Sequence, residues 1–438
     1  MSQVKKQGNI VAIIMMIFLF GMISFVTNLS SPMGDILKNQ FTVANWVGTL
    51  GVFANFIAYA VMGIPAGIML DRWGYKKTAL TAIAIGFIGV GIQTISGTIG
   101  SSAALGVYLL GAFVAGFSMC MLNAVVNPML NNLGGGGNRG NQLIQVGGSF
   151  NSLCGTTVII MTGILIPKIT EAKIVDVFPL MFTALAIFAL AFVVIAFAKI
   201  PEKEKVVVVE SEKSQYSPLS FRHFILGAVA IFVYVGVEVG IPNILQKWLQ
   251  NDVDVMRMFT DGTAEAIAGS VAGTYWFLML IGRLTGAAIA KNVSAKSMLI
   301  TVSSLGLVLV LLAIMLPKSI LVDLPVFKND AGALFGLAKV PINAALLVLC
   351  GLCTSVMWGG IFNLAVEGLG KFTEKASGFF MVMVCGGGIL PLLQNGIVDL
   401  TGGTGYLVSY WVVIAGMAYL LYYALLGSKN INKNIPVE

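Results

Sequence analysis

The fold of this chain is decided by one short charged stretch, Gly67-Ile-Met-Leu-Asp71-Arg72-Trp-Gly74-Tyr-Lys76-Lys77. It separates two apolar segments, each about as long as the 20 residues that a helix needs to cross a membrane. Gly67 lets two helices approach closely, and Gly74 allows a tight turn. Asp71 can accept hydrogen bonds from the N-terminus of a facing helix in one conformation and release them in another. We interpret the stretch, with Arg72, as a conformational latch; the alternative is a plain basic loop.

The composition supports a membrane protein. The chain has 438 residues, of which 57% are hydrophobic and only 10% are charged, whereas soluble domains carry about 25% charged residues. The 51 glycines are scattered through apolar segments, as expected for closely packed membrane helices. The net charge of +7 comes from basic residues in short loops, so we expect no nucleic-acid partner.

Twelve apolar segments are long enough to span a bilayer. A polar stretch between the sixth and seventh segments predicts a cytoplasmic linker at 201–221, with six-helix bundles at 1–200 and 222–438. The fold prediction is therefore an all-α integral membrane protein with twelve transmembrane helices in two six-helix bundles. The segments are roughly 9–33, 46–70, 79–97, 103–131, 142–167, 177–199, 223–249, 266–290, 297–316, 341–369, 376–399 and 406–427.

The basic residues predict the orientation. If the N-terminus is cytoplasmic, 18 of the 26 lysines and arginines fall on the cytoplasmic side and 8 on the other. The positive-inside rule therefore predicts a multi-pass protein with both termini in the cytoplasm. The scarcity of long soluble loops favours a bacterial inner membrane, that is, the plasma membrane. We expect a monomer.

A carboxylate lies deep in the seventh segment. Glu238 is followed four residues later by Pro242, which has no N–H, so the carbonyl of Glu238 loses its helical partner. An acid at this depth is by default a functional-site hypothesis. We expect a substrate or coupling role, with either a proton or a sodium ion. The alternative is a structural carboxylate, neutral or paired with an arginine.

Other polar residues in apolar segments suggest a neutral polyhydroxyl ligand, because an amide offers a donor and an acceptor together. Tryptophans add flat surfaces on which a sugar ring could stack. The alternative is hydrogen bonding between helices. The candidate substrate-binding residues are Asn123, Asn127, Gln145, Asn151, Glu238, Asn243, Trp276, Trp358, Asn363, Gln394 and Asn395.

Metal and enzyme chemistry are not expected. The five cysteines lie in apolar segments, and Cys350-x-x-Cys353 has no histidine beside it. The single histidine, His223, sits at the edge of the seventh segment. No acid pair or nucleophile with a base stands out, so we expect no metal, no bound cofactor and no enzyme activity.

The charged stretch resembles the helix 2–3 loop signature of the major facilitator superfamily. Most of the chain resembles one branch of it, the fucose:proton symporter family. The matching motifs are, in order, Leu122-Asn123-Ala-Val-Val-Asn127-Pro128, Phe150-Asn151-Ser152, Tyr234-Val-Gly-Val-Glu238, Trp276 with Gly282-Arg283-Leu-Thr-Gly286, Ile361-Phe-Asn363-Leu-Ala-Val-Glu-Gly-Leu-Gly370, and Gly386-Gly-Gly-Ile-Leu-Pro-Leu-Leu-Gln394.

The resemblance implies alternating-access uptake of a neutral sugar, such as a hexose, with Arg283 in a second latch loop. Two acids of the family pattern are replaced here, by Ser31 on the first helix and Asn123 on the fourth. Asp35 could substitute for the first only after a shift of four residues. Glu238 therefore remains the candidate coupling group, and sodium symport, proton symport and facilitated diffusion stay open. The rival function is an exporter of drugs or other small metabolites.

Overall fold

The computed structural model describes residues 2–41, 50–166, 172–198, 200–201, 216–259, 264–330, 333–402, 404–432 and 434–437. Two compact units are distinguished. Unit 1 comprises Met1–Ile225, Val366–Val384 and Asn430–Glu438, and unit 2 comprises Leu226–Ala365 and Cys385–Lys429. Most of the predicted linker, 202–215, lies outside the described residues, and the division into two six-helix bundles stays a prediction.

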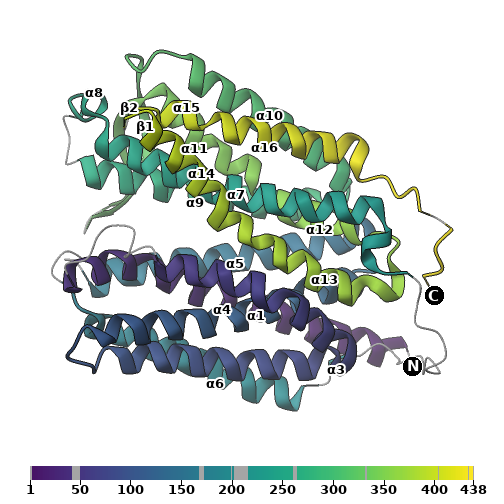
Figure 1. The fold of residues 1–438 in the computed structure, drawn as a ribbon. Coiled ribbons are helices and arrows are strands. Elements are labelled where there is room, and N and C mark those ends of the chain that lie inside the picture. The colour runs from purple at the N-terminus through teal and green to yellow at the C-terminus, as the bar shows by residue number, and fades with distance from the viewer. Residues whose placement is uncertain are drawn as a thin grey trace. The chain divides into compact units, whose positions relative to one another are not determined.

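Unit 1 is a bundle of long helices in which α4 packs against α1, α3 and α5, and α6 packs against α3 (Figure 1). A segment from late in the sequence, α13, also packs against α3 and α4. The α-helices are α1 (Ser2–Phe41), α3 (Leu50–Ser96), α4 (Ala103–Leu133), α5 (Gly137–Leu165), α6 (Phe178–Phe197) and α13 (Thr373–Val382), with 3-10 turns η2 (Ile174–Val177), η3 (Pro218–Ser220) and η4 (Gly370–Phe372).

The helix α3 is two helices joined at a bend. Gly74 has φ 81° and ψ 180°, which is not helical. Residues with a side chain rarely adopt a positive φ, so glycine is the residue that makes this turn at little cost. The expected tight turn at Gly74 is confirmed.

Unit 2 holds the remaining elements, except that the first turn of α7, the last residue of α12 (Val366) and the first two residues of η5 (Met383 and Val384) belong to unit 1. Here α11 packs against α9 and α10, and α10 runs beside α16 (Figure 1). Its helices are α7 (Arg222–Asn251), α8 (Val253–Met256), α9 (Ala264–Ile289), α10 (Ala295–Met315), α11 (Ile342–Thr354), α12 (Met357–Val366), α14 (Gly386–Leu400), α15 (Tyr406–Ser409) and α16 (Trp411–Tyr422), with the short turns η5 (Met383–Cys385) and η6 (Tyr423–Gly427).

Three segments predicted as single helices are interrupted, and one of them, 406–427, divides into α15, α16 and η6. The predicted helix 341–369 divides into α11 and α12, and the predicted helix 376–399 divides into α13 and α14. The break between α11 and α12 lies at a close approach of α9, because a Cβ on Gly282 would overlap the Ser355 hydroxyl and one on Gly286 would overlap Val356. Apolar periodicity does not reveal such breaks, since both sides of each break are equally apolar.

A β-hairpin departs from the all-α prediction. The strands β1 (Leu321–Asp330) and β2 (Ala333–Pro341) pair antiparallel, with Val322 opposite Val340 and Val326 opposite Gly336. Val326 and Val340 are buried, whereas Leu321 and Leu337 are exposed. This alternation with a period of two is the strand signal that a search for apolar helices overlooks.

The described part of the chain has ten helices long and apolar enough to cross a membrane. One of them, Phe53–Ser96, has 44 residues and contains the bend at Gly74. The helix α5 is not among the ten. The prediction of a multi-pass membrane protein is confirmed, and the number twelve stays a prediction.

Candidate functional site

The carboxylate of Glu238 is paired in unit 2. Tyr234, one turn earlier on α7, donates its hydroxyl proton to Glu238 Oε1 at 2.7 Å. Arg283 on α9 places Nη2 at 3.3 Å from the same oxygen, and the two side chains are 11% and 13% exposed. The structure therefore shows the pairing that the sequence left as an alternative. Because the partner is on another helix, sequence spacing could not identify it.

The carbonyl freed by Pro242 also has a partner. The helix α7 runs through Pro242, and the Tyr275 hydroxyl of α9 lies 3.2 Å from the carbonyl oxygen of Glu238. The same hydroxyl is 2.9 Å from Thr354 Oγ1 on α11. Three helices therefore meet at Glu238, and its main chain and side chain are both held.

The aromatic residues near Glu238 differ in how far they are buried. Trp276 and Trp358 are each half-buried and so keep exposed surface. Tyr234 packs against Trp358, with ring centroids 6.3 Å apart, and Tyr275 meets Trp276 edge-on at 5.4 Å. Both tyrosines are fully buried, so they support the tryptophans. Asn363 on α12 is buried, 6% exposed.

A second polar group in unit 2 lies between α7 and α14. Lys247 Nζ donates to Asn395 Oδ1 at 2.7 Å, and Asn395 Nδ2 lies 3.4 Å from Asn243 Oδ1. The neighbouring Gln394 is fully buried, and within the described residues neither of its amide atoms has a hydrogen-bond partner. The structure thus brings three predicted residues together and adds Lys247, which was overlooked because it lies near the end of α7.

The predicted amides of unit 1 are mostly engaged between or within helices. Asn123 Nδ2 donates to the Tyr59 hydroxyl of α3 at 2.8 Å, and Asn127 Nδ2 donates to the Asn123 carbonyl at 2.8 Å. Asn151 Nδ2 donates to the carbonyl of Phe20 on α1 at 2.7 Å. Asn123, Asn127 and Gln145 are buried, whereas Asn151 is half-buried. These contacts agree with hydrogen bonding between helices, and a substrate role for the four residues stays a prediction. The side chains at 31 and 35 lie outside the description.

The charged stretch of α3 meets α13 within unit 1. A Cβ on Gly67 would lie 2.8 Å from Gly378 Cα, so the expected close approach at Gly67 is confirmed. Asp71 Oδ2 is 3.3 Å from Lys375 Nζ in the first turn of α13. Asp71 thus faces the beginning of a helix, as expected, but its observed partner is a side chain and not the backbone N–H groups.

A buried hydrogen-bond chain accompanies this junction, and the motif did not predict it. The Tyr75 hydroxyl donates to Glu374 Oε1 at 3.0 Å and accepts from Asn132 Nδ2 of α4 at 3.0 Å. Tyr75 and Glu374 are 3% and 6% exposed. Arg72 is exposed, and Arg283 lies with Glu238 in unit 2, so a latch role for either arginine stays a prediction.

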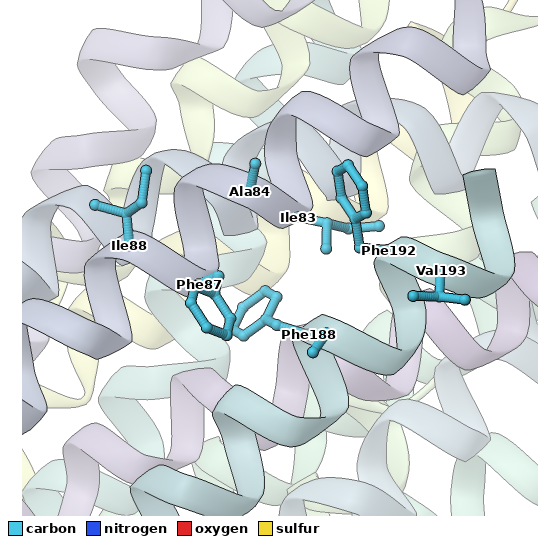
Figure 2. Close-up of a pocket in the computed structure, with 8 residues that line it drawn as sticks. Ile83, Ala84, Phe87, Ile88, Phe188, Phe192 and Val193 are labelled. Atoms are coloured by element: carbon cyan, nitrogen blue, oxygen red, sulfur yellow. The ribbon is translucent and has the colours of Figure 1, made fainter.

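An apolar groove in unit 1 is not a sugar site. It has a volume of about 390 Å³ and lies between the second half of α3 and α6 (Figure 2). Every side chain of its lining is apolar, so it offers no hydrogen bond to a hydroxyl. The lining residues are Ile83, Ala84, Phe87, Ile88, Phe188, Ala189, Phe192 and Val193.

Comparison with known proteins decides the family. The model of the Major Facilitator Superfamily matches residues 11–427. This chain belongs to the Major Facilitator Superfamily. Members of the superfamily are transporters, so the prediction of a transporter and not an enzyme is confirmed.

Individual members of the superfamily extend the match. The chain is 28% identical over 422 residues to a glucose/galactose transporter of Brucella abortus biovar 1 (strain 9-941), covering 94% of this chain and 93% of the relative. It is 21% identical over 423 residues to the L-fucose-proton symporter of Escherichia coli (strain K12), covering 91% and 89%. These matches confirm the resemblance to the fucose symporter.

A solved structure of the superfamily agrees with the fold. The crystal structure of the transporter FucP in the outward conformation superimposes with a TM-score of 0.79 at 19% identity, covering 97% of this chain and 100% of the other. The chain therefore has the helical major facilitator fold.

Proposed function

We propose that the chain is a transporter that takes up a neutral sugar, a hexose, by alternating access. The observation that carries this proposal is the similarity to a glucose/galactose transporter over 94% of the chain. The half-buried Trp276 and Trp358, together with the amides of α7 and α14, supply the stacking and hydrogen-bonding groups that a pyranose requires.

The proposed topology has twelve transmembrane helices. The bend at Gly74 divides the 44-residue span Phe53–Ser96 into two crossings, and α5 adds another to the ten candidate spans. The excess of basic residues on one side supports a cytoplasmic location for both termini. We further infer a monomer surrounded by lipid in a bacterial inner membrane.

The energy source is proposed to be a cation gradient that acts through Glu238. Its carboxylate lies 3.3 Å from Arg283, so binding of H⁺ or Na⁺ must compete with the guanidinium. A competition of this kind can couple cation binding to the arrangement of α7 and α9. Facilitated diffusion is the outcome if no gradient drives accumulation.

Uptake of labelled glucose, galactose and fucose by proteoliposomes tests the function, with sodium and pH gradients imposed separately. Accumulation under one gradient supports symport, and exchange without accumulation indicates a uniporter. No uptake and no counterflow across a broad sugar panel would refute the sugar proposal and favour an exporter of other small molecules.

Glu238→Gln tests the coupling role, because glutamine keeps the size of the side chain but removes its charge. Lost accumulation with preserved exchange would assign coupling to Glu238. Unchanged accumulation would show that the carboxylate is structural. The matched control is Glu367→Gln, since Glu367 is an exposed glutamate.

A further inference from the structure

The polar chain between α7 and α14 has a fixed hydrogen-bond direction. Lys247 Nζ donates to Asn395 Oδ1 at 2.7 Å. Asn395 Nδ2 donates to the carbonyl of Pro391 at 2.7 Å and faces Asn243 Oδ1 at 3.4 Å. All four residues belong to unit 2.

Chemistry allows only one orientation of the Asn395 amide. An ammonium group has donors and no acceptor, so the atom that faces Lys247 is the amide oxygen. A backbone carbonyl only accepts, so the atom that faces Pro391 is the amide nitrogen. The second N–H of that nitrogen is directed to Asn243, which must present its oxygen in return. The N–H₂ group of Asn243 is then left for another partner.

The surroundings point to a ligand. Lys247, Asn243 and Asn395 are each half-buried, although α7 is a candidate membrane span. Partly exposed polar side chains on such a helix are expected to face water or a ligand rather than lipid. Beside them lies Gln394, a fully buried amide with no hydrogen-bond partner among the described residues. Buried amides are usually satisfied, which sets this part of unit 2 apart from an ordinary helix contact.

We propose that Asn243 is a donor contact to the substrate and that Lys247 and Asn395 are positioning residues that impose this direction. The Asn243 N–H₂ group therefore donates to the oxygen of one sugar hydroxyl, which acts as the acceptor. This inference rests on the proposed function and adds which kind of hydrogen bond the sugar must make.

Monodeoxy and monofluoro galactoses test the direction of the bond. A fluorine keeps a weak acceptor but cannot donate, whereas a deoxy position can do neither. At one ring position, the deoxy sugar should compete about tenfold more weakly than galactose, and the fluoro sugar should stay within about threefold of it. Competition is measured as inhibition of labelled galactose counterflow.

Two substitutions should remove the difference between the fluoro and the deoxy sugar. Asn243→Asp still accepts from Asn395 but presents a carboxylate oxygen to the sugar. With Asn395→Asp, the new carboxylate accepts from Lys247 and from the Asn243 amide, so Asn243 turns its oxygen to the sugar. In both variants the fluoro sugar should become as weak a competitor as the deoxy sugar. The matched control is Asn251→Asp, since Asn251 is exposed on the same helix, and it should keep the wild-type pattern.

The outcomes are separable. Equal losses for fluoro and deoxy sugars at every position of the wild type would overturn the inference, as would a wild-type pattern in a folded Asn395→Asp variant. If that variant fails to fold, the same comparison of fluoro and deoxy sugars is made with Asn243→Asp. Failure of every parent sugar to compete would overturn the proposed function itself, and the inference with it.

Discussion

The contact between α3 and α13 offers the sharpest test of the structure. A Cβ added to Gly378 would lie 2.6 Å from the Gly63 carbonyl oxygen and 2.6 Å from Gly67 Cα. These atoms belong to the backbone of α3 and cannot rotate away. Gly378→Ala therefore forces the two helices apart. Restoring a contact of 3.4 Å, the lower limit of ordinary packing, requires a separation of about 0.8 Å.

The energetic effect follows from three contributions. Overpacking of this kind costs about 1–3 kcal/mol. The same separation stretches the hydrogen bond between Tyr75 and Glu374, now 3.0 Å, and its loss costs about 1.5–3 kcal/mol because the acceptor is charged. Alanine regains about 1 kcal/mol of helix propensity. The net destabilisation of the junction is about 1.5–5 kcal/mol, which is at least about tenfold in its open fraction.

Hydrogen exchange measured by mass spectrometry on the purified protein reports this opening. Peptides that cover 60–78 and 370–382 should exchange at least about tenfold faster in Gly378→Ala than in the wild type. Gly91→Ala is the control, because it lies on the same helix α3 and its Cβ would meet nothing within 4 Å. Equal exchange in the two variants would refute the close approach of α3 and α13.

Three further predictions concern the remaining contacts. Arg283→Leu leaves the carboxylate of Glu238 buried without its cation and should lower the free energy of unfolding by about 3–5 kcal/mol. The double variant with Glu238→Gln should recover most of this loss. An unchanged free energy of unfolding in Arg283→Leu alone would contradict the ion pair. Burial raises the pKa of Asp252, but hydrogen bonds from a lysine and a tryptophan lower it by more, so its folded pKa lies below the usual value. The ionised Asp252 carboxylate therefore stabilises the fold above about pH 4, and this stabilisation is lost as the pH falls through the lowered pKa. Proteolysis of the α7–α9 connection should therefore become faster below about pH 4 in the wild type but not in Asp252→Asn. Asn432→Ala removes the side chain that accepts from the first N–H of α7 and should cost about 1 kcal/mol in thermal unfolding, whereas the same change at the exposed Asn434 should cost nothing; equal effects would contradict the cap.

The composition and the apolar pattern were sufficient to predict the helices. Long apolar segments must form helices in a bilayer, since every backbone polar group there needs an internal partner. The same rule does not detect the hairpin of β1 and β2, whose alternating pattern lies outside those segments. It also does not detect the breaks at Ser355 and Cys385, because the sequence stays apolar across both.

The sequence by itself determined the family, the turn at Gly74 and the residue types available for a sugar site. Those features depend on local conformation and on composition, and both are written in consecutive residues. Only the tertiary structure decided that Glu238 pairs with Arg283, that Lys247 meets Asn395, and that Tyr75 meets Glu374, whose positions differ by 45, 148 and 299 residues. Such partners are selected by the packing of whole helices, and no spacing along one helix encodes them.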